Sequence, residues 1–401
     1  MEGPLNGVLV LDLSRVLAGP FCTMVLADLG ARVIKVEAPP SGDDSRSFGP
    51  FVGDKSAYFM SLNRGKQSIA LDLKQPGDRV LFERLLDRAD VLVENFRPGA
   101  MAKLGYGWER LHADHPRLVY AAVSGFGQTG PRWEQPAYDL VIQAMGGVMS
   151  ITGQPGLPPV RVGTSMGDIT AGLYATIGIC AALRHREITG QGMMVDVAML
   201  DCQVAILENA IARYGAEGRP PGPLGTRHPS ITPFDLYNAA DGPMVICAGN
   251  DNLFAQLCRA LERQDLIADQ RFGSNQLRTA NQEALKSELE STLSRKPRAH
   301  WLDRLAARGV PCGPINDLAG VLAEPQVAAR NMLVTSDDPQ VGPVSMAGNP
   351  IKLSAFADPG SRPPAPELDH DRQAILAEMG GPDAADPTAG VRQNHTRSKT
   401  S

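Results

Sequence analysis

Short apolar runs alternate with helix-forming stretches through the first part of the chain. Five such runs occur up to Ser124, and they are Val8–Leu13, Arg32–Glu37, Ser68–Leu73, Asp90–Asn95 and Leu118–Ser124. Strands that alternate with helices form βαβ units, whose strands pair in parallel. Runs that are apolar without strict alternation are typical of strands covered on both faces. The pattern predicts an α/β fold built on a mostly parallel sheet.

The second half of the chain predicts a further unit reached through a linker. The segment from Tyr138 to Gly215 is rich in helix formers, with one strand expected near Met193–Val197. The Gly- and Pro-rich stretch from Gly215 to Pro223 is typical of a linker. Beyond it, the apolar runs Thr232–Tyr237 and Met244–Ala248 flank a turn and predict a β-hairpin.

The last part of the chain predicts a helical stretch, then a strand-like segment, then a tail. Leu- and Arg-rich stretches predict helices from Leu253 to Arg308, and an irregular, strand-like segment is expected from Gly309 to Phe356. Large apolar side chains are almost absent from Gly381 onward. Such a composition cannot form a packed core, so residues 381–401 are expected to be a disordered tail.

Charge and cysteine content narrow the class of function. A net charge of −5 gives no electrostatic case for nucleic acid or an acidic membrane as a partner. The six cysteines include no C-x-x-C pair and the seven histidines no i, i+4 pair, which favours free thiols in a reducing compartment and gives no support for a metal site. The start of the chain lacks the basic residues of a signal peptide. The longest uncharged helical run, Ile169–Leu183, is shorter than the ~20 residues that cross a bilayer. We therefore expect a cytoplasmic protein.

Asp168 stands alone between a Gly-rich turn and that long uncharged run. Aspartate is among the best N-cap residues, because its oxygen accepts hydrogen bonds from the free N–H groups of the first turn. Its charge also suits the positive end of the helix dipole. Local rules therefore favour a helix cap, and the alternative is a nucleophilic carboxylate.

A glycine-rich loop follows the last of the five apolar runs. Gly125-Phe-Gly127-Gln-Thr-Gly130 has the G-x-G-x-x-G spacing of a dinucleotide-binding turn. That turn must open a helix, whereas here Pro131 and Pro136 bound the following segment. The sequence thus argues against a nicotinamide cofactor. The loop is still expected to line a binding crevice at the carboxyl end of a parallel strand.

Taken in order, a series of short strings resembles the class III CoA-transferases, the family that includes carnitine CoA-transferase-like and bile-acid-inducible proteins. The likeness runs from about residue 4 to 380. The strings are Pro4-Leu-Asn-Gly7, Val10-Leu-Asp12, Leu17-Ala-Gly-Pro20, Leu29-Gly-Ala-Arg-Val-Ile-Lys-Val-Glu37, Asn63-Arg-Gly-Lys66, Val93-Glu-Asn-Phe-Arg-Pro-Gly99, Gly125-Phe-Gly127, Gly167-Asp168, Thr189-Gly-Gln-Gly192 and Val310-Pro-Cys-Gly-Pro-Ile315.

The resemblance implies a large Rossmann-like domain with a parallel sheet and a smaller α+β domain inserted late in the chain. It also implies a homodimer in which the two subunits are interlocked rings. Residues 1–214 would form the first part of the large domain, 215–225 the linker and 226–325 the small domain. Residues 326–380 would return to the large domain ahead of the tail.

The resemblance also implies roles for individual residues around the reacting carboxylate. Asp168 matches the nucleophilic aspartate of the family, which carries the acyl group as an anhydride and then carries CoA as a thioester. Other positions are expected to line the active site, and they are Gly127, Tyr138, Asp139, Arg227, Gly249 and Asn250. A carboxylate is a suitable covalent catalyst for acyl transfer.

CoA thioester is implied as a co-substrate, with no permanently bound cofactor and no metal. The residues that match CoA-contacting positions of the family are Leu17, Ala18, Leu71, Lys74, Asn95, Phe96, Arg97 and Lys103. The alternative for Lys74 and Lys103 is ordinary solvated surface, since lysines are seldom buried.

The resemblance leaves three readings of the function. Racemases of the same superfamily carry Gly-His-Asp where this chain has Ala137-Tyr138-Asp139, so CoA transfer is favoured over α-methylacyl-CoA racemisation. A catalytically silent CoA-binding protein is the reading from a different class, and the presence of Asp168 argues against it. The stretches around Arg227 and Gly249 resemble members that use succinyl-CoA and dicarboxylic acids. Arg227 would then pair with the distal carboxylate of the acid.

Overall fold

The computed structural model describes residues 2–379 of the chain. The chain forms two compact units. Among the described residues, the first unit contains 2–147, 163–208 and 329–379. The second unit contains residues 148–162 and 209–328. The expected domain boundaries at 214, 225 and 325 stay predictions.

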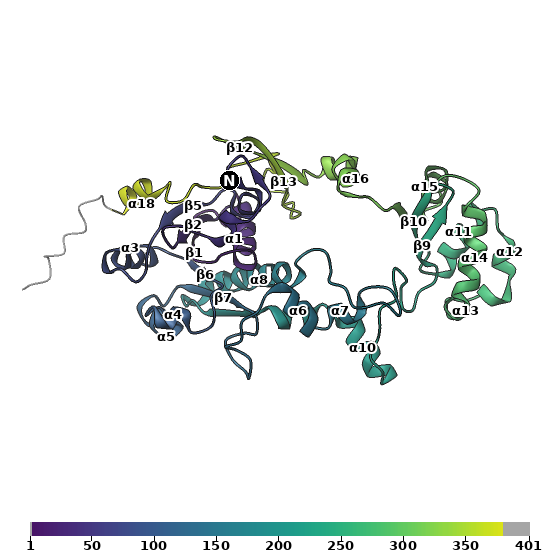
Figure 1. Ribbon diagram of the computed structural model, residues 1–401, viewed down its shortest axis with the longest axis horizontal. Coiled ribbons are helices and arrows are strands. Elements are labelled where there is room, and N and C mark those ends of the chain that lie inside the picture. Colours follow the sequence, from purple (N-terminus) through teal and green to yellow (C-terminus); the bar gives the residue numbers. More distant parts are fainter. Residues whose placement is uncertain (1, 380–401) are drawn as a thin grey trace, which may run out of the picture. The chain divides into compact units, whose positions relative to one another are not determined.

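A six-stranded parallel sheet forms the centre of the first unit (Figure 1). Its strands are β1 (Leu9–Asp12), β2 (Arg32–Glu37), β5 (Gln67–Ala70), β6 (Val91–Glu94), β7 (Val119–Ser124) and β8 (Met194–Ala198). They lie in the order β5-β2-β1-β6-β7-β8, and every neighbouring pair is parallel. This is the Rossmann order, in which the chain reverses its direction of winding between the first and fourth strands. The prediction of an α/β fold with a parallel sheet is confirmed.

Helices of the first unit cover both faces of this sheet or lie at its edges. They are α1 (Ala18–Asp28), α2 (Ala57–Asn63), α3 (Pro76–Leu86), α4 (Ala100–Lys103), α5 (Trp108–Asp114), α6 (Asp139–Met145), α8 (Met166–Thr189), α9 (Met199–Ala205) and α18 (Arg372–Glu378), with a short 3-10 helix at Asp44–Ser47.

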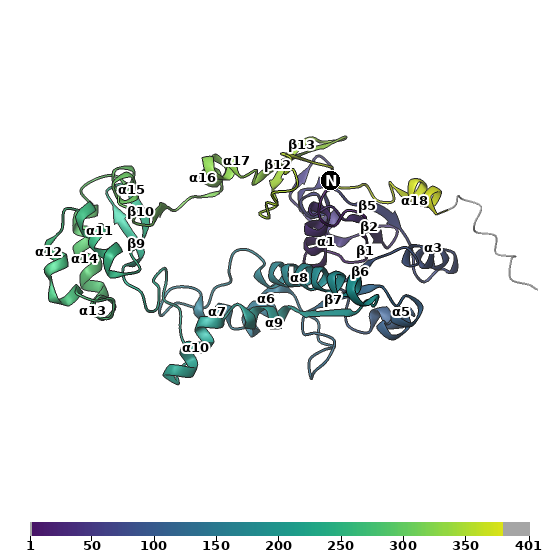
Figure 2. The ribbon, with the colours of Figure 1, turned by 180° about the vertical axis from the view of Figure 1, so that it is seen from behind.

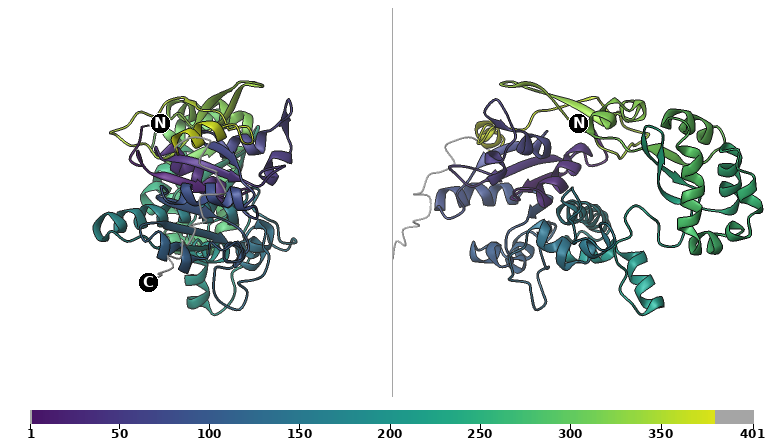
Figure 3. Two further views of the ribbon diagram at one scale, coloured as in Figure 1. Left: turned by 90° about the vertical axis from the view of Figure 1, so that its left-hand side faces the viewer. Right: turned by 45° about the vertical axis from the view of Figure 1, so that its right-hand side comes forward.

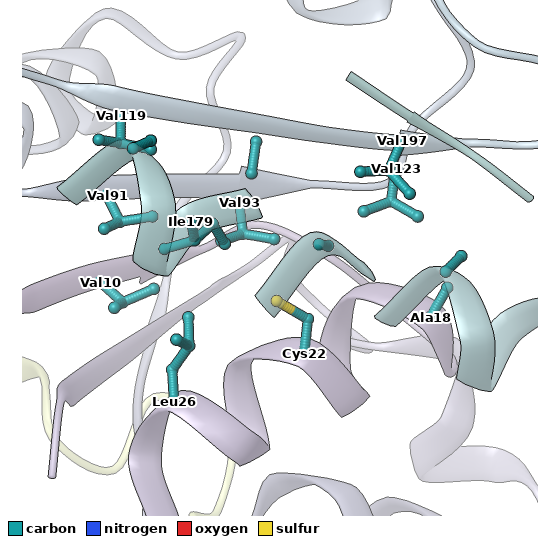
Figure 4. Close-up of a cluster of buried hydrophobic side chains, with 14 of the residues drawn as sticks. Val10, Ala18, Cys22, Leu26, Val91, Val93, Val119, Val123, Ile179 and Val197 are labelled. Carbon is teal, nitrogen blue, oxygen red and sulfur yellow. The ribbon is translucent and has the colours of Figure 1, made fainter. Parts of the chain in front are cut away.

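The alternation of strand side chains creates two separate hydrophobic cores. On one face Val10, Val91 and Val93 pack against α1 and α8. Figure 4 shows Leu26 of α1 and Ile179 of α8 pointing toward these strand side chains. On the opposite face, the neighbouring strand residues pack against α3, α5 and α18. The central strands β1, β6 and β7 are therefore buried on both sides, as their apolar runs predict.

Small antiparallel strands complete the first unit. They are β3 (Phe51–Val52), β4 (Lys55–Ser56), β12 (Leu333–Asp338), β13 (Gly342–Ala347) and β14 (Ser361–Arg362), of which β14 runs parallel to β12. Figure 2 shows the β12–β13 hairpin beside the amino-terminal part of the chain. The Lys55 Nζ atom bonds the Asp338 carboxylate at 2.7 Å, which ties the two chain regions together.

Helices α1 and α8 approach each other closely at Gly172 of α8. A Cβ atom there would lie 2.8 Å from the backbone oxygen of Ala18 and 3.1 Å from the ring of Phe21. Real Cβ atoms do not approach backbone oxygens so closely, so any larger side chain must push the two helices apart.

Replacing Gly172 by alanine is expected to lower the free energy of unfolding by about 1–3 kcal/mol, the usual cost of an overpacked core. Urea or thermal unfolding measures the change. Gly77 of α3 is the matched control, because a Cβ atom there has nothing within 4 Å. Gly77→Ala should leave stability unchanged or slightly improve it. Equal stability of the two variants would contradict the prediction.

The second unit is a small α+β body. Its elements are α7 (Val148–Ile151), α10 (Glu208–Glu217), β9 (Phe234–Ala239), β10 (Gly242–Cys247), α11 (Asp251–Ala260), α12 (Asp265–Ala268), α13 (Asn275–Ala280), α14 (Gln282–Leu293), α15 (Arg298–Ala306), β11 (Cys312–Pro314), α16 (Leu318–Ala323) and α17 (Pro325–Ala329), with a 3-10 helix at Gln270–Phe272. The predicted hairpin is confirmed as β9–β10, which β11 extends. Figure 3 shows the green helices of this unit packed against the hairpin, where Phe254, Leu285 and Leu289 are buried.

The prediction of an irregular, strand-like segment from Gly309 to Phe356 is wrong in part. Strands are present, but α16 and α17 lie between β11 and β12. The Asp317 carboxylate accepts a hydrogen bond from the Gly320 amide at 2.8 Å and so caps α16. An aspartate followed by the helix-forming run Leu-Ala-Gly-Val-Leu-Ala is a local helix signal that the expectation of an irregular segment did not take into account. The expected tail at 381–401 lies outside the described residues.

Helix α8 meets the length and apolarity of a membrane span within the described residues. Half of its most apolar stretch is buried inside the protein. Ala171, Ala175 and Ile179 belong to the core between the helix and the sheet. The helix therefore has the burial of a core helix.

Candidate active site

A pocket of about 210 Å³ opens at the carboxyl ends of β1, β6 and β7. Ligands of Rossmann-like sheets bind at this edge, where the winding direction reverses. The lining comes from the end of β7, the three segments that follow these strands, the 3-10 helix at Asp44–Ser47 and the helices α8 and α9. The residues are Arg15, Val16, Leu17, Ala18, Asp44, Asn95, Phe96, Arg97, Pro98, Val123, Ser124, Gly125, Gln135, Pro136, Ala137, Tyr138, Asp168 and Met199.

The loops after β1 and β6 are bonded to each other. The Asn95 Oδ1 atom accepts the Arg15 amide at 2.8 Å, and the Asn95 Nδ2 atom donates to the Arg15 carbonyl at 2.8 Å. Next to it, the buried Glu94 carboxylate accepts the Phe96 amide at 2.7 Å. The Tyr120 hydroxyl donates to the same carboxylate at 2.9 Å. These bonds fix the backbone of Asn95 and Phe96 where it enters the pocket wall.

Asp168 is the third residue of α8, and its carboxyl group lies in the pocket wall. Burial raises the pKa of this carboxyl group to about 7, and the negative charge of Asp139 adds to the shift. The expectation that Asp168 caps the helix is wrong. Ser165 occupies the N-cap position, and Asp168 lies inside the first turn.

The capping hydrogen bond comes instead from Asp139 of α6. Its Oδ1 atom accepts the Gly167 amide at 2.8 Å, and its Oδ2 atom accepts Nε2 of the buried Gln143 at 2.8 Å. A Cβ atom at position 167 would lie 3.1 Å from the Asp139 carboxylate, so glycine allows the close approach. Asp139 therefore binds the start of α8 and places a second carboxylate beside Asp168.

Tyr58 of α2 is a further group near these carboxylates. Burial raises the pKa of its hydroxyl to about 12, and the charges of Asp168, Asp43 and Asp139 contribute to the shift. The hydroxyl therefore stays protonated and able to donate a hydrogen bond. No motif of the sequence marks Tyr58, which reaches the site through the tertiary fold alone.

The arrangement suits covalent chemistry at a carboxylate. Asp168 titrates near neutral pH in a partly buried pocket, so its ionised form is poorly solvated and available as a nucleophile. Within residues 2–379, no group of three or more His, Cys, Asp or Glu side chains could hold a metal ion. Two arginines of the pocket wall, Arg15 and Arg97, offer positive charge to an anionic ligand.

Comparison with known proteins decides the family. The family model described as CoA-transferase family III matches residues 5–372. The chain belongs to CoA-transferase family III. It is 50% identical to the acetyl-CoA:oxalate CoA-transferase of Acetobacter aceti, over 96% of this chain and 97% of that protein. It is 44% identical to the succinyl-CoA:mesaconate CoA-transferase of Haloarcula hispanica, over 94% of this chain and 97% of that protein.

A solved structure agrees with this assignment. The crystal structure of a CaiB/BaiF family protein from Brucella suis superposes with a TM-score of 0.83 at 41% identity, over 94% of this chain and all of that chain. The predicted membership of the class III CoA-transferases is confirmed. The protein is thus an enzyme that transfers CoA between an acyl-CoA and a carboxylic acid.

The fold of this CoA-transferase brings many of the predicted site residues into one pocket. Those that line it are Leu17, Ala18, Asn95, Phe96, Arg97, Tyr138 and Asp168. They come from segments far apart in the sequence. Asp139 lies directly behind the wall, bound to the residue that precedes Asp168.

Other predicted CoA-contacting residues lie outside this wall. Leu71 is 2% exposed, its side chain packs in the core and its amide donates to the Glu37 carbonyl at 2.8 Å. Lys74 and Lys103 are exposed at the surface, after β5 and at the end of α4. Gly127 is buried with φ of +84°, and its amide donates to the Ser124 hydroxyl at 3.0 Å.

Three predicted residues belong to the second unit. Arg227 lines a small cavity there together with Asp235 and Lys286. Gly249 and Asn250 lie in the loop before α11, where the Asn250 Oδ1 atom accepts the Leu253 amide at 2.9 Å. Asn250, the last residue of this loop, is therefore the N-cap of α11.

Some residues of the pocket wall are not among those predicted from the sequence. Arg15 and Val16 precede the matched pair Leu17 and Ala18, and Gln135 and Pro136 precede Tyr138. Their proximity in sequence to matched residues is a signal that could have found them. Asp44 and Met199 come from other segments, and no local pattern marks them.

Proposed function

We propose that Asp168 is the nucleophile of an acyl-CoA:carboxylate CoA-transferase. The observation that carries the proposal is the partly buried Asp168 carboxyl group, with a pKa of about 7, in the pocket at the reversal point of the sheet. Asp168 also matches the reacting aspartate of the family. The carboxylate oxygen attacks the thioester carbonyl of the donor, and CoA leaves as the thiolate. The product is a mixed anhydride between Asp168 and the donor acid.

The exchange is completed in three further steps. The CoA thiolate attacks the Asp168 carbonyl of the anhydride, which releases the donor acid and leaves an aspartyl-CoA thioester. The acceptor carboxylate attacks this thioester and expels CoA thiolate, which forms a second anhydride. The thiolate then attacks the acceptor carbonyl, which yields the new acyl-CoA and restores the Asp168 carboxylate.

Each of these steps passes through a tetrahedral oxyanion that needs hydrogen-bond donors. Leu17 and Ala18 line the pocket at the start of α1, where backbone N–H groups precede the first intrahelical hydrogen bonds. The positive end of the helix dipole favours negative charge at the same place. These amides are our candidates for oxyanion stabilisation, together with the glycine loop at Gly125.

Acyl-CoA and hydroxylamine provide the direct test of the nucleophile. Hydroxylamine should intercept the anhydride or the thioester and leave a hydroxamate on Asp168, located by peptide mass spectrometry. Absence of this adduct in an actively transferring enzyme would refute the covalent route. Exchange of the α-hydrogen of the acyl group in D₂O, without CoA transfer, would instead indicate racemase chemistry.

For the substrates, we propose succinyl-CoA or a similar donor and a dicarboxylic acceptor. The similar protein from Acetobacter aceti is named for acetyl-CoA and oxalate, and the one from Haloarcula hispanica for succinyl-CoA and mesaconate. Both acceptor acids in these names are dicarboxylic acids. A panel of CoA donors against mono- and dicarboxylic acids tests the proposal. Arg227 is proposed to pair with the distal carboxylate, because guanidinium and carboxylate form two parallel hydrogen bonds.

Replacing Arg227 by alanine should lower kcat/KM for a dicarboxylic acceptor by roughly 10- to 100-fold, the value of a lost charged hydrogen bond. The same variant should leave a monocarboxylic acceptor of similar size unchanged. Arg219, whose side chain is 82% exposed, is the matched control, and Arg219→Ala should behave as wild type with both acids. Equal losses with both acids in Arg227→Ala would contradict this role.

We also propose an interlocked homodimer in the cytoplasm. Leu173, Tyr174 and Ile177 of α8 leave between 41% and 63% of their surface exposed in the single chain. An apolar patch on a core helix is typical of a surface that a partner covers. Light scattering coupled to size-exclusion chromatography should give the mass of two chains, and a monomer would refute the dimer.

A further inference from the structure

Val16 has a backbone conformation that its residue type rarely adopts. Its φ is +66°, in the left-handed region, and valine is branched at Cβ. Such a conformation persists only where the surrounding structure imposes it, and it is concentrated at functional sites. Val16 lines the pocket that contains Asp168 and stands two residues before α1.

The backbone amide of this residue is bound by Asp43. The Val16 amide donates to the Asp43 carboxylate, at 3.0 Å from Oδ1 and 3.3 Å from Oδ2. The same Oδ1 atom accepts the amide and the hydroxyl of Ser45 at 2.9 and 2.8 Å, which fixes the carboxylate itself. The amide of Val16 is thus held by a group that does not line the pocket.

Lys35 of β2 binds both the Asp43 carboxylate and the loop that contains Val16. Its Nζ atom lies 2.9 Å from the Asp43 Oδ2 atom and donates to the Ser14 carbonyl at 2.7 Å. The side chains of Lys35 and Asp43 are 0% and 1% exposed. One buried ammonium therefore connects the acceptor of the Val16 amide to the backbone of the same loop.

The neighbouring residues of this loop are held as well. The Ser14 amide donates to the buried Asp12 carboxylate at 2.9 Å, and Asn95 bonds both backbone groups of Arg15. The loop between β1 and α1 therefore has a fixed partner at each of three successive amides. Among these partners, only the Asp43 carboxylate binds the residue with left-handed φ.

We propose that Asp43 and Lys35 are positioning residues that hold Val16 in its left-handed conformation and so fix part of the wall of the pocket that Asp168 also lines. The role rests on the proposed function of Asp168. Neither side chain is required to touch the substrate. The pair acts through the backbone that leads into Leu17 and Ala18, and without it Val16 relaxes to negative φ and displaces that backbone.

The test compares Asp43→Ala, the double variant Asp43→Ala/Val16→Gly and the control Asp28→Ala in the full-length enzyme. Asp28 is 3% exposed and pairs with Arg64 at 2.7 Å, so it is a buried ionic carboxylate of the same unit that does not line the pocket. The readouts are kcat and KM for one active donor and acceptor pair, thermal stability, and hydrogen exchange of the peptide that contains Val16.

We expect Asp43→Ala to lower kcat by roughly 10- to 100-fold, as a small misplacement at a reacting centre does, with a smaller change in KM. The peptide that contains Val16 should lose its exchange protection. Glycine adopts positive φ readily, so Val16→Gly should restore part of the lost kcat without restoring stability. Asp28→Ala should lose stability and keep kcat at a temperature where it is folded.

Three outcomes would overturn the positioning role while leaving the transferase proposal intact. The first two are an unchanged kcat in Asp43→Ala and a lost kcat that Val16→Gly does not improve. A kcat loss in Asp28→Ala equal to that in Asp43→Ala would likewise assign the effect to general destabilisation. A wild-type enzyme that transfers CoA without forming an adduct on Asp168 would refute the proposed function instead, and its exchange data would still report on Val16.

Discussion

Replacing Asp168 by alanine is expected to lower kcat for CoA transfer by at least about 10³-fold, because loss of a covalent nucleophile removes the main route to product. Transfer is followed by chromatographic separation of the CoA thioesters. The hydroxamate should disappear from the peptide that contains position 168. A variant that retains more than a tenth of wild-type activity would exclude Asp168 as the nucleophile.

The thermal stability of a second variant, Asp168→Asn, serves as the control for folding. The pKa of Asp168 is raised from its ordinary value of 3.8 to about 7 in the folded state, so the ionised form is disfavoured there. The folded protein then binds more protons than the unfolded chain between these values, and this group's contribution to stability falls as pH rises from about 4 to 7. At pH 8 the isosteric Asp168→Asn should therefore have a Tm no lower than wild type. Loss of activity with an unchanged or raised Tm separates chemistry from folding.

The pH dependence of kcat/KM should show a limb near pH 7. In the proposed mechanism the Asp168 carboxylate is the reactive form, so activity should fall about tenfold for each pH unit below its pKa and level off above it. The negative charge of Asp139 is one cause of the raised pKa. Asp139→Asn should therefore shift the limb to lower pH, while its amide oxygen can still accept the Gly167 hydrogen bond.

Initial rates from pH 5 to 9, with donor and acceptor far below saturation, measure both profiles. Gln143→Ala is the matched control, since it removes a neighbour of Asp139 at 2.8 Å without removing a charge. Its limb should stay closer to that of wild type. An Asp139→Asn limb at the wild-type position would show that burial alone sets the pKa of Asp168.

The sequence was sufficient for the main features of the sheet. The segment Arg32–Glu37 is β2 as predicted, the runs at Val8–Leu13, Asp90–Asn95 and Leu118–Ser124 contain β1, β6 and β7, and the run Ser68–Leu73 overlaps β5. Periodicity and turn residues are local properties, and burial on both faces leaves a clear apolar run. The helices between β11 and β12 were missed, because each is short and depends on a single capping residue or proline for its start.

Local sequence rules predict the active site less well than the sheet. They favoured a cap at Asp168, but the cap is Asp139, which lies 28 residues before the amide it accepts. A tertiary contact of this kind has no local pattern. The role of Asp168 came from the ordered family resemblance, and the same resemblance also carried over Leu71, whose side chain packs in the core.

Val16 illustrates the limit in another way. Its left-handed conformation contradicts the preference of a β-branched residue, so propensity alone predicts the wrong backbone. Its amide donates to a carboxylate 27 residues later in the chain, which is paired with a lysine on a neighbouring strand. Such a site is found only when the fold has brought these groups together.

The capping bond of Asp139 has a consequence for engineering. One carboxylate accepts a hydrogen bond in the first turn of α8 and also adds its charge to the burial that raises the pKa of Asp168. Substitutions that relieve the repulsion between these two acids should raise thermal tolerance and alter reactivity together. A library selected only for heat resistance would therefore enrich changes at this turn that also move the pH dependence of the enzyme, and selection for turnover at the working pH has to be applied in the same round.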